Sequence, residues 1–155
     1  MRRQTSSVLF VLILCLLLLP ACGQTTTSKQ GTGSSHPVQI SVDAGAYHGS
    51  DPISVMVTNQ SASTFYAPDH QTSCTIVQLQ MRSGDQWQTM GECALKTPTR
   101  MLRVGHDASN VYTLTPPKSG WSAGTYRVAL SYSQQENAPA GSMSQAYSPK
   151  FQVNA

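Results

Sequence analysis

The pattern of hydrophobic and polar positions changes near residue 36. Before that point there is one long apolar run, residues 8–19, which carries no charge. After it, short segments with alternating or β-branched apolar residues recur between turn-forming residues, and no long helical period is present. Such segments predict β-strands, and their number predicts an all-β sandwich or barrel.

We expect about eight strands in residues 37–155, which is close to the size of one sandwich domain. In the strand expected at residues 53–58, Ile53, Val55 and Val57 share one face. The other strands are expected at residues 38–42, 75–81, 86–92, 100–104, 110–114, 125–132 and 147–153. Residues 43–51 and 59–73 are expected to form loops.

Local motifs narrow the type of sandwich. Residues 122–128 contain Gly124 and Tyr126 in a pattern that resembles a tyrosine corner, in which the hydroxyl bonds back to the preceding turn. Together with Val-Thr-Asn at residues 57–59 and with Gly84 followed by Trp87, it resembles the bacterial immunoglobulin-like domains of exported lipoproteins. The resemblance covers residues 55–132. It implies an immunoglobulin-like antiparallel β-sandwich of about seven to eight strands without a defined reaction.

Residues 1–21 resemble a lipoprotein signal peptide. Arg2 and Arg3 precede the apolar run, which as a helix covers roughly 18 Å and is shorter than the hydrocarbon core of a bilayer. The run ends in Leu19-Pro20-Ala21-Cys22, which resembles a lipobox. This implies cleavage after Ala21 and lipid on Cys22, which anchors the protein to a bacterial membrane outside the cytoplasm. An uncleaved anchor and ordinary secretion are the alternatives.

Removal of the signal peptide changes the charge of the chain. Without Arg2 and Arg3, eight of the ten Lys and Arg remain against seven Asp and Glu, a net charge of +1. No basic stripe remains, so nucleic acid is not an expected partner. Residues 22–36 follow as the lipidated cysteine and a polar tether without aliphatic or aromatic side chains, which predicts flexibility. The folded domain is expected at residues 37–155.

Cys74 and Cys93 remain after Cys15 leaves with the signal peptide and Cys22 is acylated. An even pair in an oxidising compartment favours a disulfide. A turn centred on residues 83–84 would pair positions whose numbers add up to 167. This register sets the two cysteines opposite each other, within bridging distance, and sets Met90 opposite Val77. A free or metal-bound pair is the alternative.

The chain carries no complete signature of a known catalytic site. The patterns H-E-x-x-H, G-x-G-x-x-G and the P-loop are missing. Residues 120–124 read G-W-S-A-G and match G-x-S-x-G, but they lead into the strand expected at residues 125–132 and not into the helix that a nucleophile elbow requires. The carboxylates are scattered, and no thiol is expected to be free for nucleophilic catalysis. We therefore expect neither an enzyme nor a cofactor.

Two groups of residues are candidate sites. If three loops share one end of the sandwich, five side chains could bind a divalent metal there. The five are Asp69, His70, His106, Asp107 and Glu136. The alternative is that these residues only form turns, as such residues more often do. Trp87 lies on the hairpin face opposite Val77 and Leu79, with Ile76 and the disulfide. It is expected either to pack under a loop or to anchor a partner.

These features favour a membrane-anchored, non-enzymatic module that interacts with another exported or envelope protein. One alternative is a lipoprotein that binds a small solute or a divalent metal through the loop end. The other is a protease-inhibitor-like domain that presents the loop at residues 59–73 or at residues 134–146.

Overall fold

The computed structural model describes residues 37–94 and 100–154. The predicted signal peptide, the lipobox with Cys22 and the tether at residues 22–36 lie outside the described residues. Within the described residues, no helix is long and apolar enough to cross a membrane.

The described residues form a sandwich of antiparallel sheets, which confirms the all-β prediction. Eleven strands and two short 3₁₀ helices are present in the described part of the chain. The strands are β1 (Val38–Val42), β2 (Ala46–His48), β3 (Ile53–Asn59), β4 (Phe65–Pro68), β5 (Val77–Ser83), β6 (Gln86–Thr89), β7 (Met101–Val104), β8 (Ser109–Leu114), β9 (Gly124–Tyr132), β10 (Ser144–Tyr147) and β11 (Phe151–Asn154). The 3₁₀ helices are η2 (Gly91–Cys93) and η3 (Ala140–Ser142).

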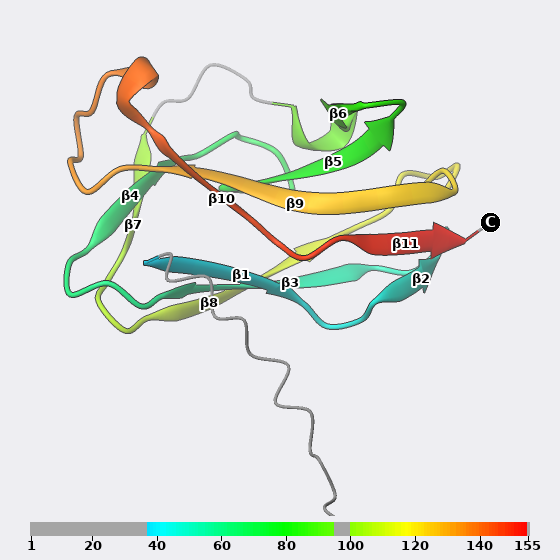
Figure 1. The fold of residues 1–155 in the computed structure, drawn as a ribbon, viewed down its shortest axis with the longest axis horizontal. Helices are drawn as coiled ribbons and strands as arrows, with labels where there is room; N and C mark the ends of the chain where they lie inside the picture. The colour runs from blue at the N-terminus through cyan, green and yellow to red at the C-terminus, as the bar shows by residue number, and fades with distance from the viewer. Residues whose placement is uncertain (1–36, 95–99, 155) are drawn as a thin grey trace, which may run out of the picture. The chain divides into compact units, whose positions relative to one another are not determined.

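Two of the sheets form the layers of the sandwich (Figure 1). One has the strand order β1-β3-β8, and the other has the order β2-β11-β9-β5-β6, with β10 also paired to β9. The two-stranded sheet β4-β7 lies beside these layers, and its residue Tyr66 exchanges backbone hydrogen bonds of 2.7 and 2.9 Å with Ser133 after β9. The strand pairs are antiparallel except for β2 with β11.

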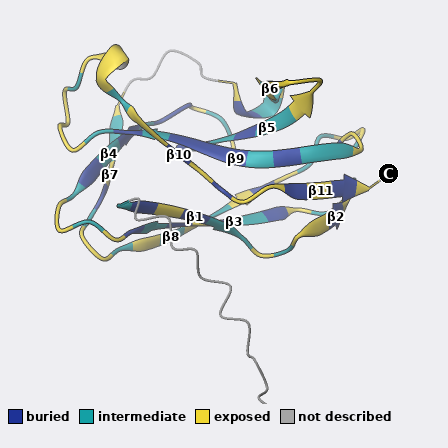
Figure 2. Ribbon diagram, viewed as in Figure 1, coloured by how far each residue is buried: buried dark blue, intermediate teal, exposed yellow. Residues whose placement is uncertain are grey.

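The core lies between the layers, where buried residues alternate with more exposed ones along β1, β3, β5 and β11 (Figure 2). Ile53, Val55 and Val57 are fully buried, as the alternation predicted. On β9, the buried residues Tyr126 and Val128 face them from the opposite sheet. Burial of a side chain of this size stabilises the fold by about 1.5–3 kcal/mol.

The prediction that residues 43–51 form only a loop was wrong, because β2 lies within them. Tyr47 of β2 is buried, its ring meets the Phe151 ring edge-on with centroids 5.3 Å apart, and its hydroxyl donates to Asp43 at 2.6 Å. The strand forms by parallel pairing with β11, which is the last strand of the domain in the sequence. A three-residue strand with one apolar side chain has no period that local sequence could reveal.

The prediction of a loop at residues 59–73 was also wrong, because it contains β4. Phe65 and Ala67 of this strand are buried, and the Phe65 ring lies 5.4 Å from the Tyr132 ring between centroids. The buried Asn59 side chain fixes the turn before β4 by donating to the carbonyl groups of Ser63, Val104 and Gly105.

The predicted hairpin is present, but its register is shifted by two residues. Ser83 pairs with Gln86, so the turn consists of Gly84 and Asp85, and the paired numbers add up to 169. Gly84 takes a φ of 58°, which glycine adopts without steric cost. The Met90 amide accordingly donates to the Leu79 carbonyl rather than lying opposite Val77.

The strand predicted at residues 147–153 is divided into β10 and β11. Pro149 lies between them and has no amide hydrogen to donate to a ladder. Ser148 maintains the connection to β9, because its backbone amide donates to the Val128 carbonyl at 2.9 Å and its hydroxyl oxygen accepts from the Val128 amide at 2.8 Å.

Candidate interaction surface

The outer face of the six-stranded sheet holds a group of aromatic and polar side chains that contact one another. We call the part formed by β6, β5, β9 and β10 the outer face. The alternation that buries Tyr126 and Val128 places Thr125, Arg127 and Ser131 on this side. The registers of the neighbouring strands add Gln78, Gln80, Arg82, Trp87, Thr89, Gln145 and Tyr147.

Arg127 lies between two aromatic rings on this face. Its guanidinium carbon is 4.4 Å from the centroid of the Trp87 ring and 3.9 Å from that of the Tyr147 ring. Trp87 is half-buried, and Tyr147 is 47% exposed. Each cation–π contact contributes about 0.5–1 kcal/mol at an exposed site. The three side chains, from β6, β9 and β10, form what we call the aromatic cluster.

Hydrogen bonds hold the polar neighbours of the aromatic cluster in place. The Arg127 Nε–H donates to the Gln80 side-chain oxygen at 2.8 Å. The Gln145 amide donates to the Ser131 hydroxyl at 2.7 Å. The face is therefore ordered before any ligand arrives, which lowers the entropic cost of binding.

The outer face has a positive charge at its centre. Strands β5, β6, β9, β10 and β11 contain no Asp or Glu. Arg82 forms a 3.3 Å ion pair with Asp85 in the turn, whereas Arg127 has no carboxylate within ion-pair distance among the described residues. An anion would therefore meet a cation here that is already positioned and not neutralised.

The sequence singled out Trp87 on this face but not Arg127 or Tyr147. Trp87 pairs with Arg82 on the side of the sheet opposite the buried Val77 and Leu79, and it is half-buried. Ile76 does not share this face, because it precedes β5 and is fully buried. A charged residue in the middle of the strand at residues 125–132 was the available signal for Arg127.

The tyrosine corner is confirmed by its hydrogen bond. The Tyr126 hydroxyl donates to the Ser122 carbonyl at 2.7 Å, and Gly124 begins β9 between them. The Tyr126 ring is fully buried and stacks on Phe151 with centroids 6.0 Å apart. The corner therefore fixes the start of β9, the strand that carries Arg127.

The predicted disulfide between Cys74 and Cys93 is present, with Cα atoms 5.4 Å apart. The cysteines do not face each other across the ladder. Cys74 lies in the turn before β5 and Cys93 in η2, and both are buried. The bond joins the two ends of the hairpin that carries Trp87, and its burial favours a structural role.

Asp69 and His70, which precede Cys74 of the disulfide in the sequence, make contacts within the fold. Asp69 accepts from the Gln71 amide at 2.9 Å and from Arg100 at 3.1 Å, and these contacts lower its pKa. His70 is buried, which lowers its pKa, while its hydrogen bond to the Cys93 backbone acts in the opposite direction. Its Nδ1 atom has no hydrogen-bond partner among the described residues.

The five predicted metal ligands do not form one site. Among the described residues, no three His, Cys, Asp or Glu side chains come together as a group that could hold a metal ion. His106 contacts Asp107 at 2.9 Å and the Ser61 carbonyl at 2.6 Å, and Glu136 is exposed on another loop.

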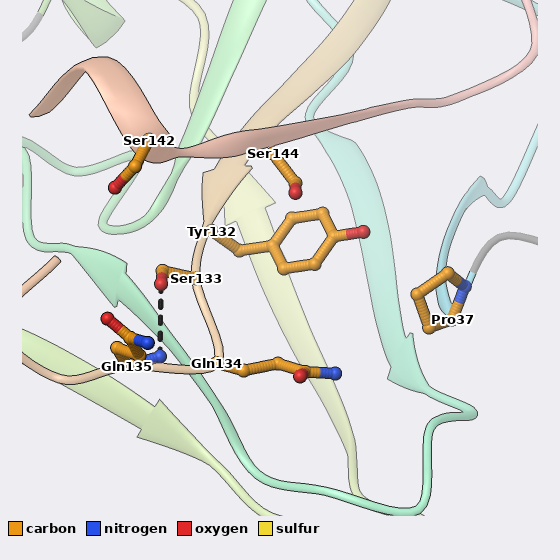
Figure 3. A pocket seen from close by; sticks show the side chains of 7 residues that line it. All are labelled: Pro37, Tyr132, Ser133, Gln134, Gln135, Ser142 and Ser144. Atoms are coloured by element: carbon orange, nitrogen blue, oxygen red, sulfur yellow. Dashed lines mark hydrogen bonds between the residues drawn. The ribbon is translucent and has the colours of Figure 1, made fainter.

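A shallow pocket of about 400 Å³ lies where β9 ends, beside the start of β1 (Figure 3). Its lining consists of Pro37, Tyr132, Ser133, Gln134, Gln135, Ser142 and Ser144. Burial raises the pKa of Tyr132, and a hydrogen bond with Ser144 opposes that rise. The pocket offers amides and hydroxyls but no charged side chain, and its chemistry fits a small uncharged polar solute.

Comparison with known proteins does not assign a family. No protein-family model and no curated protein matches the chain. Two similar solved structures are a Pseudomonas fluorescens alkylpurine DNA glycosylase, AlkC, bound to DNA containing an abasic site analogue, and a Listeria innocua beta-glucosidase in complex with gluconolactone. The first has a TM-score of 0.35 and 10% identity over 81% of this chain and 32% of that one. The second has a TM-score of 0.33 and 11% identity over 76% of this chain and 16% of that one.

The chain thus spans about a third or less of these two proteins. At this level of similarity, their activities carry no argument for this one.

Proposed function

We propose that this protein is a lipid-anchored exported protein whose sandwich domain binds an envelope partner without catalysing a reaction. The aromatic cluster on the outer face carries this proposal. A tryptophan, an arginine and a tyrosine held together at a surface are the side chains most enriched where binding energy concentrates. The Leu19–Cys22 motif supports the proposed location of the protein, since a lipid on Cys22 would place the domain at a membrane surface.

The lipid anchor is tested on full-length protein made in a bacterial host that processes lipoproteins. Mass spectrometry should find an N-terminal Cys22 carrying acyl chains, and Cys22→Ala should lose both the lipid and the membrane fraction. Recovery of unmodified Cys22, or of Met1 on the native protein, would contradict the proposed membrane anchoring.

The binding surface is tested by comparing two exposed-face variants of the anchored protein. Envelope proteins and glycans retained on vesicles that carry the wild-type protein should be lost with Trp87→Ala. They should be kept with Val111→Ala, which removes a 65% exposed side chain from the opposite sheet. Equal retention by both variants would show that the aromatic cluster does not bind the partner.

A second candidate function is the binding of a small polar solute in the pocket beside Tyr132. The pocket's volume and uncharged lining favour it. It is tested by a thermal-shift screen of sugars and polyols. A rise in melting temperature that disappears in Ser144→Leu would support the pocket, and a screen without any shift would dispose of it.

The inhibitor-like alternative finds less support in the loops that it needs. Residues 59–73 contain the buried strand β4, and residues 134–146 contain η3 and part of β10.

A further inference from the structure

We infer that the outer face binds an acidic polysaccharide, with the aromatic cluster stacking on sugar rings and Arg127 binding a carboxylate. This inference rests on the proposed binding function and names the chemical class of the partner. Its first support is the exposed aromatic surface. Tyr147 is 47% exposed, and Trp87 is held close to it by the guanidinium that both rings contact. Exposed aromatic surface of this kind can stack against the C–H faces of pyranose rings.

The side chains around the aromatic cluster can form hydrogen bonds with sugar hydroxyl groups. Side chains bearing amides or hydroxyls fill the neighbouring positions, namely Gln78, Gln80, Thr89, Ser131 and Gln145. An amide both donates and accepts, as does a sugar hydroxyl. The side-chain nitrogen of Gln80 and the side-chain oxygen of Gln145 are not used in the two hydrogen bonds that order these residues.

The composition of the face favours a glycan over a protein partner. Protein interfaces have a fully buried, more apolar centre. The outward positions of β5, β6, β9 and β10 hold no Val, Leu, Ile, Met or Phe, and Ala129 is buried opposite Tyr147. Exposed aliphatic residues lie instead on the opposite sheet, where Met56 pairs with Val111. An aromatic cluster surrounded by polar side chains fits a hydrated polymer better than it fits an apolar protein patch.

Charge complementarity identifies the polymer as acidic. Arg127 is the one cation of the outer face that no described carboxylate neutralises, since Arg82 is paired with Asp85. A guanidinium binds a carboxylate through two parallel N–H groups when its fork is free. The hydrogen bond to Gln80 uses Nε and leaves both terminal nitrogens for a ligand. The four strands span roughly 14 Å at about 4.8 Å between neighbours, which is room for several sugar rings.

The experiment measures binding of the full-length protein to three polymers by affinity electrophoresis. Polygalacturonate carries sugar rings and carboxylates, pullulan carries sugar rings alone, and poly-glutamate carries carboxylates alone. The wild-type protein should bind polygalacturonate at least tenfold more tightly than either of the others, and added salt should weaken this binding. Trp87→Ala should abolish binding to polygalacturonate. Arg127→Gln should weaken that binding at least tenfold and remove the preference over pullulan.

Two control variants separate local from general effects. Arg103→Gln removes an exposed charge from β7, and Val111→Ala trims the opposite sheet, so both should bind as the wild type does. Equal binding to all three polymers, or an unchanged preference in Arg127→Gln, would overturn the inference. Failure to bind any glycan, together with capture of an envelope protein that Trp87→Ala loses, would overturn the glycan partner and leave the proposed function standing.

Discussion

The backbones of Gly49 and Trp121 touch where the turn after β2 meets the segment before β9. The Trp121 amide donates to the Gly49 carbonyl at 2.8 Å, and the Trp121 indole N–H donates to the Asp51 carbonyl at 3.0 Å. A Cβ atom on Gly49 would stand 2.9 Å from the Trp121 carbonyl oxygen. Because this neighbour is backbone, it cannot rotate away, and a residue without a side chain is required at position 49.

Gly49→Ala should therefore destabilise the domain by about 1–3 kcal/mol, the usual cost of inserting an atom into a well-packed site. The control is Gly45→Ala in the loop before β2, where an added Cβ meets nothing within 4 Å. That change should be neutral or slightly stabilising, because alanine restricts the unfolded chain. Urea unfolding of both variants measures the difference, and equal midpoints would contradict the packing argument.

Tyr126→Phe should cost about 0.5–1.5 kcal/mol, because it removes the hydrogen bond to the Ser122 carbonyl and keeps the buried ring. Tyr66→Phe is the matched control, since the Tyr66 ring is half-buried and its hydroxyl makes no hydrogen bond to a described residue. Thermal unfolding of the two variants should place Tyr126→Phe several degrees lower. If Tyr66→Phe lost as much stability, the loss in Tyr126→Phe could not be assigned to the hydrogen bond of the corner.

The structural features that depend only on residues close together in the sequence were predicted correctly. Alternation identified the inward faces of β3 and β9, and the Gly-x-Tyr pattern identified the corner. Cys74 and Cys93 were correctly paired by elimination, although the reason given for their closeness was wrong. The register shifted by two residues because Gly84 and Asp85 form the turn in place of residues 83 and 84, and a shift of two keeps every side chain on its predicted face.

What could not be predicted depends on contacts between distant segments. Strand β2 exists because β11 pairs with it. Strand β4 exists because it pairs with β7 and forms a bridge to the residue that follows β9. The aromatic cluster joins residues 87, 127 and 147 from three strands, so it requires the order of strands in the sheet. Alternation places Trp87 and Arg127 on outward faces but does not say that those faces belong to one surface.

Removal of the disulfide by Cys74→Ala with Cys93→Ala should cost roughly 3 kcal/mol, the value expected for a closed loop of about twenty residues in the chain-entropy model. The wild-type protein should lose similar stability when unfolded in dithiothreitol, whereas the double variant should not respond to the reductant. Urea unfolding with and without reductant measures both effects. A double variant as stable as the oxidised protein would show that the buried bond contributes nothing to the folded state.

The stability of the domain should fall as the pH drops below about 6.5, the ordinary pKa of histidine, because of His70. Burial lowers the pKa of His70 in the folded protein, so the unfolded chain takes up a proton that the folded chain still excludes. Stability therefore rises with pH in this window, with a slope of up to about 1.4 kcal/mol per pH unit. The pKa of Asp69 is lowered too, but its contribution is lost only in more acidic solution, near and below the ordinary range of aspartate. Urea unfolding between pH 7.5 and pH 5 should show a slope in the wild type that is reduced in His70→Gln, and equal slopes would remove His70 as the cause.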